Sequence, residues 1–376
     1  MTEDRLPLLY SILDQFALYG DFETASPYGT GHINSTFMSR WNQSGTRIRY
    51  LHQRINEKVF FHPGQVMENI ERVTRHITGK LKELKVPDAS RRTLTVVPSR
   101  DGKPYVRDAE GGWWRTYLFI EGTHTLELAQ SPKEASFLGS TIGRFQKQLS
   151  DLPSPRLHET IVNFHNMEWR YERFYDALAK DAFNRAREVP AEISFMKDNE
   201  ERGAVLIRAL RSGLIPERIC HNDTKMNNIL IDDSTDEGLC VGDLDTVMPG
   251  TSLFDVGDLI RTVTTRAEED ETDLAKVEFD LDYLKSLLAG YLAEATGFLT
   301  ESEKDLLLEC GRCITQIMGI RFLTDYLEGD HYYRIARPSH NIDRCRNQIA
   351  LMKSMDSKWD RAMEIMDDLR NKAGNP

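Results

Sequence analysis

The sequence contains no apolar run that approaches the roughly 20 residues needed to cross a bilayer, so it predicts no membrane-spanning segment. It also lacks the basic stripe typical of nucleic-acid-binding proteins, because 48 Lys and Arg are outnumbered by 59 Asp and Glu. The formal net charge is −11. The acidic start, MTEDRLPLLY, has neither the basic nor the long apolar segment of a signal peptide. We therefore expect a cytoplasmic protein that binds neither membranes nor nucleic acids.

Cysteine is also scarce and irregularly spaced. The five cysteines are Cys220, Cys240, Cys310, Cys313 and Cys345. An odd number at irregular spacing argues against a disulfide framework. The CxxC at 310–313 lies in a stretch with helical periodicity, and no second pair occurs at zinc-site spacing. We expect ordinary reduced thiols.

What the sequence does contain is enough chain for two lobes: 376 residues, 40% hydrophobic and 28% charged. Up to about residue 122 the pattern is mainly that of strands. The stretches 47–55, 92–97 and 112–120 are rich in β-branched and aromatic residues and are separated by turn residues. One helix interrupts them, because apolar residues recur every three or four positions over 62–84.

Helices dominate after residue 122. Ser131-Pro132 with Glu134 is typical of a helix start, and Thr300 with Glu303 has the spacing of a capping box. The stretch 339–370 is again helical in pattern. We therefore predict an α+β, bilobal molecule, with a sheet-rich N-lobe at 1–122 and a mainly helical C-lobe at 123–376. Ligands often bind where two such lobes meet.

A short strand-loop-strand segment, 217–247, interrupts the helical part and is unusually polar at its loop. His221, Asp223 and Asn228 give the spacing H-x-D-x-x-x-x-N, and Asp243 follows a second apolar run. Phosphoryl transfer to a hydroxyl needs a carboxylate to orient the hydroxyl and oxygen ligands for Mg²⁺. A single loop Asp or Asn usually forms only a turn, as we expect for 232–238. The set at this spacing instead favours Asp223 as base and Asn228 and Asp243 as magnesium ligands.

A second candidate segment lies near the N-terminus, in PYGTGHINSTF (27–37). Gly29 and Gly31 allow a tight turn between two strands and close backbone approach to phosphate oxygens. His32 and Asn34 are polar groups at the tip of this turn that could reach ligand oxygens. The segment therefore fits a flexible turn over nucleotide phosphates.

These motifs resemble the aminoglycoside phosphotransferase and choline kinase superfamily, which is related to protein kinases. A closer likeness is to bacterial N-acetylhexosamine 1-kinases, with their GxGHIN, HNDTKxNNIL, DLDTVMPG and RFLTDYL segments. The matching segments here are GTGHIN at 29–34, HNDTKMNNIL at 221–230, DLDTVMPG at 243–250 and RFLTDYL at 321–327. The likeness extends from about residue 20 to about residue 352. It implies a kinase-like fold with an antiparallel N-lobe sheet.

The resemblance also implies roles for individual residues. It makes Asp223 the catalytic base and Asn228 and Asp243 the ligands of Mg²⁺, and it places the glycine turn, including Thr30, over ATP. The sugar site would draw on Asp223, Arg321 and Tyr332. From its own pattern, Arg321 lies in an otherwise apolar helix, where the alternative is a structural ion pair with Asp325.

One departure from the kinase pattern concerns the third strand, where a lysine usually holds the α- and β-phosphates. Here Gln53 and Arg54 stand in its place, and alternation along a strand lets only one of them face the cleft. Its acidic partner on the 62–84 helix could be Glu68 or Glu71. We expect adenine to bind the backbone of the segment between the lobes, around Phe119 to Gly122, which includes Glu121.

The sequence thus predicts transfer of the ATP γ-phosphate to the anomeric hydroxyl of an N-acetylhexosamine, N-acetylglucosamine or N-acetylgalactosamine. The nearest alternatives are choline, ethanolamine, homoserine or aminoglycoside kinases of the same superfamily. An alternative of another class is a nucleotide-binding pseudokinase that acts as a scaffold. The expected partners are ATP and a small sugar, and the expected state is a monomer or small homo-oligomer.

Overall fold

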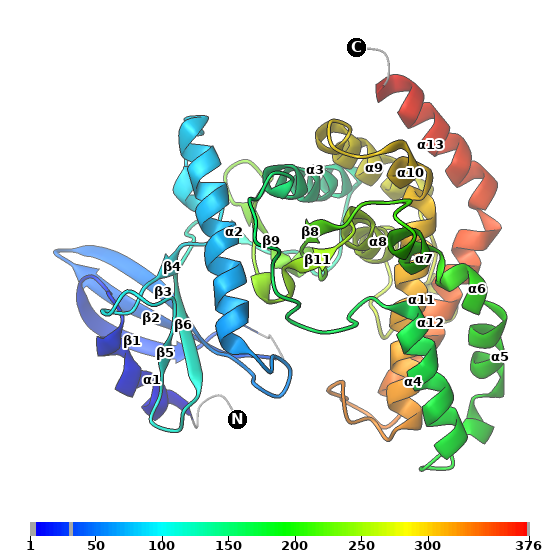
Figure 1. The fold of residues 1–376 in the computed structure, drawn as a ribbon, viewed down its shortest axis with the longest axis horizontal. Helices are drawn as coiled ribbons and strands as arrows, with labels where there is room; N and C mark the ends of the chain where they lie inside the picture. Colours follow the sequence, from blue (N-terminus) through cyan, green and yellow to red (C-terminus); the bar gives the residue numbers. More distant parts are fainter. Residues whose placement is uncertain (1–4, 30–32, 374–376) are drawn as a thin grey trace.

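The computed structural model describes residues 5–29 and 33–373 of the chain. Figure 1 shows a sheet-rich part, which holds the N-terminal residues, beside a larger helical part that ends in α13 (Trp359–Ala373). No helix among the described residues is long and apolar enough to cross a membrane. The sheet-rich part and the helical part together form the mixed α+β arrangement that the sequence predicts.

The N-terminal part is built on one antiparallel sheet with the order β1-β2-β3-β6-β4, to which β5 is added at β6. Its strands are β1 (Asp21–Pro27), β2 (Ser35–Gln43), β3 (Thr46–Arg54), β4 (Val96–Val97), β5 (Val106–Arg107) and β6 (Trp113–Leu118). The strands predicted at 47–55 and 112–120 are confirmed. The one predicted at 92–97 is wrong over its first part, because a helical turn precedes it and the chain reaches the sheet only where the Thr95 carbonyl accepts the Leu118 N–H.

Alternation along the strands gives this sheet two different faces. One face packs with α1 (Leu6–Ile12) into a small apolar cluster that includes Phe37 and Trp114. On the other face, Tyr117 packs into the main apolar core together with α2 (Pro63–Glu83). The buried residues of α2 follow the predicted stripe, so the 62–84 helix is confirmed.

The C-terminal part consists mainly of helices around a deeply buried central helix, α11. The helices, besides α13, are α3 (Pro132–Leu149), α4 (Met167–Lys180), α5 (Pro190–Asp198), α6 (Glu200–Gly203), α7 (Val205–Arg211), α8 (Ser252–Val263), α9 (Leu281–Ala295), α10 (Glu301–Asp305), α11 (Leu307–Leu327) and α12 (His340–Ser357). Both predicted helix starts are confirmed: Ser131 Oγ accepts the Glu134 N–H, and Thr300 with Glu303 forms a complete capping box. The helical stretch 339–370 is divided between α12 and α13.

Two small antiparallel units complete the fold beside α3 and α8 (Figure 1). Their strands are β7 (Thr123–His124), β8 (Arg218–Cys220), β9 (Ile229–Asp232), β10 (Gly238–Val241) and β11 (Met248–Gly250). The pairing is β10-β9-β7 in one unit and β8-β11 in the other. Because β8 ends before the polar loop and β9 begins after it, these short strands fix both ends of the segment 221–228.

Candidate active site

The polar loop 221–228 is held in place by one buried carboxylate of α8. The two oxygens of Asp255 accept the backbone N–H groups of His221, at 3.0 Å, and Asn222, at 2.7 Å. The Asp255 backbone carbonyl accepts the hydroxyl of Thr224 at 2.6 Å. Charge-assisted hydrogen bonds of this kind are stronger than neutral ones. Asp255 therefore fixes the position of the loop backbone relative to the helical core.

Asn222 and His221 add further constraints. Asn222 adopts a left-handed backbone conformation, with φ 65°, and its side-chain amide donates to the carbonyls of Cys220, Thr246 and Met248. His221 accepts the Asp223 N–H at Nδ1, at 3.2 Å, so its Nε2 carries the proton that it donates to the Gly242 carbonyl at 2.7 Å. His221 thus braces the loop and does not project a reactive nitrogen into the cleft.

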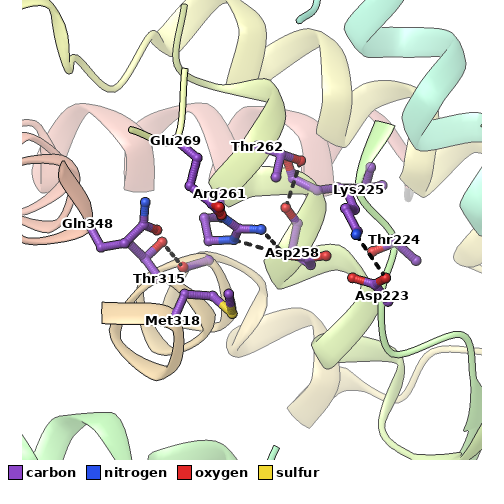
Figure 2. A network of polar contacts seen from close by, with 12 residues as sticks. Asp223, Thr224, Lys225, Asp258, Arg261, Thr262, Glu269, Thr315, Met318 and Gln348 are labelled. Carbon is purple, nitrogen blue, oxygen red and sulfur yellow. Dashed lines mark hydrogen bonds and ion pairs between the residues drawn. The ribbon is translucent and has the colours of Figure 1, made fainter. Parts of the chain in front are cut away.

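Asp223 projects from this loop with two polar neighbours. Its Oδ2 lies 3.3 Å from the ammonium nitrogen of Lys225 and accepts from Asn228 Nδ2 at 3.3 Å, and Figure 2 shows Lys225 pointing at the carboxylate. Burial by itself would raise the pKa of Asp223, but Lys225, through its charge and hydrogen bond, together with His221 and Arg261 outweighs burial and holds the pKa below its ordinary value. The carboxylate is therefore ionised at neutral pH and able to accept a hydrogen bond from a substrate hydroxyl.

Asn228 and Asp243 are brought together by the β9–β10 pairing. Val241 pairs with Ile229, and the Gly242 N–H donates to the Asn228 carbonyl at 2.7 Å. Asp243 then turns into a left-handed conformation, with φ 49° and ψ 56°, which is costly for a non-glycine residue and common at functional sites. Partial loss of water from its surroundings, together with the carboxylates of Asp245 and Asp223, raises the pKa of Asp243 to about 6, although the residue as a whole is exposed.

The donor atoms of this pair suit Mg²⁺, which is bound in kinases by one or two protein oxygens together with phosphate oxygens and water. Asn228 Nδ2 is used by Asp223, which leaves the amide oxygen as a ligand. Within the described ranges no group of three or more His, Cys, Asp or Glu side chains converges on one point. Asn228 and Asp243 therefore fit a cation shared with a phosphate ligand and not a protein-only metal site.

A second charged network lies beside Asp223 on α8 (Figure 2). Arg261 donates to Asp258 Oδ1 from Nε at 2.9 Å and to Glu269 Oε1 from NH1 at 2.8 Å. The Thr262 hydroxyl donates to the Asp258 carbonyl at 2.9 Å. Asp258 and Arg261 are both buried, and the charged groups of this network pair with one another beside the loop.

On the sheet side of the cleft, Thr30, Gly31 and His32 lie outside the described residues. Gly29 has φ 75°, the left-handed region that favours glycine, and nothing stands within 4 Å of where a side chain would begin. Asn34, just before β2, donates from Nδ2 to Asp245 Oδ2 at 2.6 Å and accepts the Asn56 N–H at 3.0 Å. The end of the glycine turn is thereby joined to the metal-ligand segment of the other lobe.

The structure separates the two residues that replace the strand lysine. Gln53 lies opposite Arg115 of β6 and accepts from Arg115 Nε at 2.9 Å. Arg54 points to the other face, where it pairs with Asp108 at 2.8 Å and Glu110 at 3.3 Å, so we leave it out of the proposed nucleotide site.

Neither candidate glutamate of α2 reaches the cleft. Glu68 lies 2.9 Å from His158, and Glu71 lies 2.6 Å from Arg75 one helical turn away, both at the surface. The expected pair between the third strand and α2 is therefore wrong. The physical reason is that the buried face of α2 at this point carries the neutral Asn69, which donates to the Val247 carbonyl at 2.9 Å.

The segment between the lobes is tied from both sides. The side chain of Glu121 forms a two-pronged ion pair with Arg49, whose guanidinium lies 3.9 Å from the centroid of the Phe119 ring. The Glu121 carbonyl already accepts from Arg91 at 2.7 Å. The side chain of Glu121 thus helps to hold this segment in shape, and the role of the Glu121 backbone in binding adenine stays a prediction.

Arg321 of α11 does not pair with Asp325. Asp325 is fully engaged, because it accepts the backbone N–H groups of His331, Tyr332 and Tyr333 and the amide of Asn341. The Arg321 guanidinium instead lies among rings, 5.0 Å from the centroid of Phe164, 5.4 Å from Tyr333 and 5.7 Å from Tyr332. Arg321 and Tyr332 are thus together, with Tyr332 59% exposed at the rim.

Sequence reasoning did not single out several residues that shape this site, namely Arg115, Asn222, Lys225, Asp245, Asp255 and Arg170. Signals existed for four of them: Asn222, Lys225 and Asp245 lie inside the segments 221–230 and 243–250, and Asp255 is an acidic residue inside the apolar run SLFDVGDLI. Arg115 and Arg170 are ordinary polar residues whose role depends on partners distant in the sequence.

An antiparallel N-terminal sheet, a helical C-terminal part and a polar loop anchored between them together define a kinase-like phosphotransferase. The chain belongs to the phosphotransferase enzyme family, whose profile matches residues 24–293.

Solved structures share the fold at low sequence identity. An aminoglycoside phosphotransferase from Alicyclobacillus acidocaldarius is 13% identical, with a TM-score of 0.56 over 97% of this chain and 96% of that one. A choline kinase from Cryptosporidium parvum is 13% identical, with a TM-score of 0.53 over 89% and 90%. A spectinomycin phosphotransferase in complex with ADP and spectinomycin is also 13% identical, with a TM-score of 0.52 over 93% and 94%.

Proposed function

We propose that this phosphotransferase uses ATP and Mg²⁺ to phosphorylate the anomeric C1 hydroxyl of an N-acetylhexosamine, N-acetylglucosamine or N-acetylgalactosamine, giving the sugar 1-phosphate and ADP. Asp223 is the proposed base, Asn228 and Asp243 the magnesium ligands, and Arg321 and Tyr332 part of the sugar site. Gly29, Thr30, Gly31, His32, Asn34 and Gln53 line the proposed nucleotide side. We also propose a cytoplasmic location for the protein.

The charge of the acceptor side carries this proposal. Arg321 and Arg170 lie close enough that burial and then the charge of Arg321 lower the pKa of Arg170 to about 9. Within residues 5–29 and 33–373 neither guanidinium forms an ion pair with a carboxylate: Arg170 donates to the Phe164 carbonyl at 2.8 Å, and Arg321 donates to the Met318 sulfur at 3.5 Å. Arg170 Nε and the Tyr333 hydroxyl are buried there without a hydrogen-bond partner.

A site with two unpaired cations repels a cationic acceptor, which wants an acidic or aromatic cage. It suits a neutral acceptor that offers oxygen atoms to N–H and O–H donors, such as ring hydroxyls and an acetamido carbonyl. Choline, ethanolamine and aminoglycosides are therefore disfavoured on electrostatic grounds. The unused donors on Arg170 and Tyr333 favour a sugar with an additional carbonyl over a simple hexose.

The proposed chemistry follows from the state of Asp223. As an ionised carboxylate it accepts a hydrogen bond from the sugar C1 hydroxyl, orients the oxygen for in-line attack and takes its proton as the new O–P bond forms. Bound Mg²⁺ would neutralise charge on the phosphates. His221, Asn222 and Asp255 hold the Asp223 backbone at a fixed depth in the cleft.

A coupled ADP-release assay tests the acceptor class directly. The panel contains N-acetylhexosamines, the parent hexoses, choline, ethanolamine, homoserine and an aminoglycoside, each at matched concentration. We expect the highest kcat/KM with an N-acetylhexosamine and a phosphorylated anomeric position by phosphorus NMR. A higher kcat/KM with an amino alcohol or aminoglycoside would reject the sugar proposal, and no ADP release above the acceptor-free rate with any acceptor would favour the pseudokinase alternative.

Arg321→Ala separates the sugar role from a structural one. We expect a KM for the sugar raised by at least about tenfold, the size of losing one charged hydrogen bond, with ATP affinity and melting temperature little changed, since Asp325 keeps all its partners. The exposed Arg361→Ala serves as control. A sharp loss of melting temperature with unchanged sugar kinetics in the folded fraction would remove Arg321 from the acceptor site.

A further inference from the structure

The cleft side of the N-terminal sheet carries a buried cation, but not from the expected strand. Gln53 of β3 is neutral and donates to the Thr36 hydroxyl at 3.2 Å, while Arg54 is engaged on the opposite face. The glutamates of α2 pair at the surface with His158 and Arg75. A coupling ion pair between β3 and α2 is therefore missing from the described residues, and some other contact must join the sheet to the metal-ligand segment.

Arg115 of β6 makes that contact. It lies directly across from Gln53 in the β3–β6 register, so the two side chains share one face of the sheet. Its side chain is 1% exposed and forms an ion pair through NH1 with Asp245 Oδ1. Its Nε donates to Gln53 at 2.9 Å. The cation is thus fixed on both sides, by the sheet and by the other lobe.

Asp245 is the point at which three segments meet. One carboxylate oxygen pairs with Arg115, and the other accepts from Asn34, the residue between the glycine turn and β2. Asp245 stands two positions after Asp243, inside the same helical turn that follows β10. A movement of Asp245 would therefore displace Asp243 and release the end of the glycine turn together.

We propose that Arg115 is a positioning residue for the binding of Mg²⁺-nucleotide: through Asp245 it fixes the segment that carries Asp243 and, through Asn34, the strand that follows the glycine turn. This inference rests on the proposed nucleotide-dependent function. It assigns to β6 and the metal-ligand segment the coupling that a lysine of β3 and a glutamate of α2 would otherwise provide.

The electrostatic argument supports the same role. Asp243 and Asp245 place two carboxylates in one tight turn, and Asp223 adds a third nearby. A buried carboxylate without a counter-charge is strongly unfavourable, so loss of Arg115 would force Asp245 to turn toward solvent. This displacement moves the turn and weakens the geometry in which Asp243 and a phosphate could share a cation. Within the described residues no hydrogen bond or ion pair joins Arg115 or Asp245 to Arg170 or Arg321 on the acceptor side, so the KM for the acceptor should change little.

The test compares Arg115→Lys with a matched control, Arg312→Lys. Arg312 of α11 is also 1% exposed and paired with one aspartate, Asp356, but lies in the helical core away from the cleft. MgADP affinity is measured by titration calorimetry on the full chain, and the melting temperature is recorded for each variant. Asn34→Ala is a third variant; it removes the link between Asp245 and β2 together with the acceptor of the Asn56 N–H, and Asn34 itself belongs to the proposed nucleotide side.

We expect Arg115→Lys to weaken MgADP binding by at least about tenfold, because lysine cannot hold Gln53 and Asp245 together in the planar geometry of arginine. Steady-state kinetics should show a raised KM for MgATP and an unchanged KM for the acceptor. Asn34→Ala should weaken MgADP by a smaller factor. Arg312→Lys should lower the melting temperature by about as much as Arg115→Lys does. Its MgADP affinity should stay within about twofold of the wild-type value.

The proposal is overturned if Arg115→Lys and Asn34→Ala both bind MgADP as the wild type does, or if Arg312→Lys weakens it equally. If Arg115→Lys does not fold, Asp245→Asn takes its place, because the amide keeps the shape of the carboxylate and loses the ion pair with Arg115. Failure of the wild-type protein to bind MgADP would instead contradict the proposed function, so the two failures are distinguishable.

Discussion

At the scale of single residues, three aspartates around one loop differ because their partners differ. Asp223 faces Lys225 and is kept ionised, with a pKa below its usual range. Asp255 accepts backbone N–H groups and serves as an anchor. Asp245 forms an ion pair with the buried Arg115 of the sheet. The same side chain thus acts as proposed base, support or connector according to what lies within hydrogen-bond distance.

Asp223→Asn tests the first of these roles. The amide keeps the shape but cannot take a proton, so we expect turnover to fall by at least about two orders of magnitude while nucleotide affinity is retained. ADP release and calorimetry on the same preparation measure both quantities. The matched control is Asp236→Asn in the exposed β9–β10 turn, a position with left-handed backbone that asparagine accepts readily. Near-normal turnover in Asp223→Asn would remove this residue from the mechanism.

The buried residue His52 predicts a specific dependence of stability on pH. His52 bridges the hydroxyls of Ser39, at 2.7 Å, and Thr116, at 2.8 Å, and burial lowers its pKa to about 3. The unfolded chain, with a histidine pKa of about 6.5, binds more protons than the folded one between these values. The contribution of neutral His52 is therefore complete above the unfolded pKa, and the free energy of unfolding falls as pH drops below it.

Replacing His52 should remove one proton from that linkage. We expect His52→Gln to be less stable at neutral pH but to show a shallower loss of stability on acidification, by up to about 1.4 kcal/mol per pH unit. Urea unfolding at several pH values gives the slope directly. The exposed His62→Gln should keep the wild-type slope. An unchanged slope in His52→Gln would show that this histidine does not resist protonation in the folded state.

At the scale of elements, close helix packing determines where the polar loop can stand. The helices α3 and α9 meet through glycines: a Cβ built on Gly290 would lie 1.9 Å from the Ser136 carbonyl oxygen, and one on Gly139 would lie 2.2 Å from the Leu287 carbonyl oxygen. From this pair, Gln146 of α3 donates to Asp255 at 2.9 Å, and the Tyr291 hydroxyl of α9 donates to Gln146 at 2.7 Å. The packing of α3 on α9 therefore extends to the anchor of the loop.

The comparison of two helix glycines tests this packing. Gly290→Ala should destabilise the protein by about 1–3 kcal/mol, because the helices must separate to admit the methyl group. Gly79→Ala in α2 has nothing within 4 Å of the added carbon and should stabilise it by about 0.5–1 kcal/mol. Urea midpoints with unchanged slopes measure both effects. Equal effects of the two substitutions would contradict the packing argument.

At the scale of the whole molecule, the proposed nucleotide site draws on both parts. The proposed magnesium ligands Asn228 and Asp243 belong to the helical part, and contacts of Arg115 and Asn34 with Asp245 join that part to the sheet. A ligand that contacts both sides should stabilise the folded state of the entire chain by mass action.

MgADP at one hundred times its dissociation constant should raise the free energy of unfolding by about 2.7 kcal/mol. A chelator should abolish most of this gain, since the cation joins the phosphates to Asp243. The Asp243→Ala variant should likewise lose the magnesium-dependent part of this stabilisation, while it still unfolds in a cooperative transition without ligand. Thermal or urea unfolding with ADP, with and without magnesium, provides the measurement. Stabilisation of Asp243→Ala equal to that of the wild type would reject Asp243 as a metal ligand.

The sequence by itself determined the features that depend on neighbours along the chain. The stripe of α2, the caps of α3 and α10, and the clustering of Asp223, Asn228 and Asp243 around a strand-loop-strand unit are all short-range patterns. They were sufficient to predict an α+β molecule and the location of the candidate site, because periodicity and capping are local physics. The kinase-like fold was implied by the resemblance of the segments 29–34, 221–230, 243–250 and 321–327.

Only the tertiary structure decided which long side chains meet. Arg115 and Asp245 stand 130 positions apart, and nothing in either local segment indicates the pair. The direction of Arg54, the surface pairing of Glu68 and Glu71, and the engagement of Asp325 by backbone N–H groups were equally open. The reason is that a charged side chain takes whichever partner the packed backbone brings within about 3 Å, and strand register and helix packing set that choice.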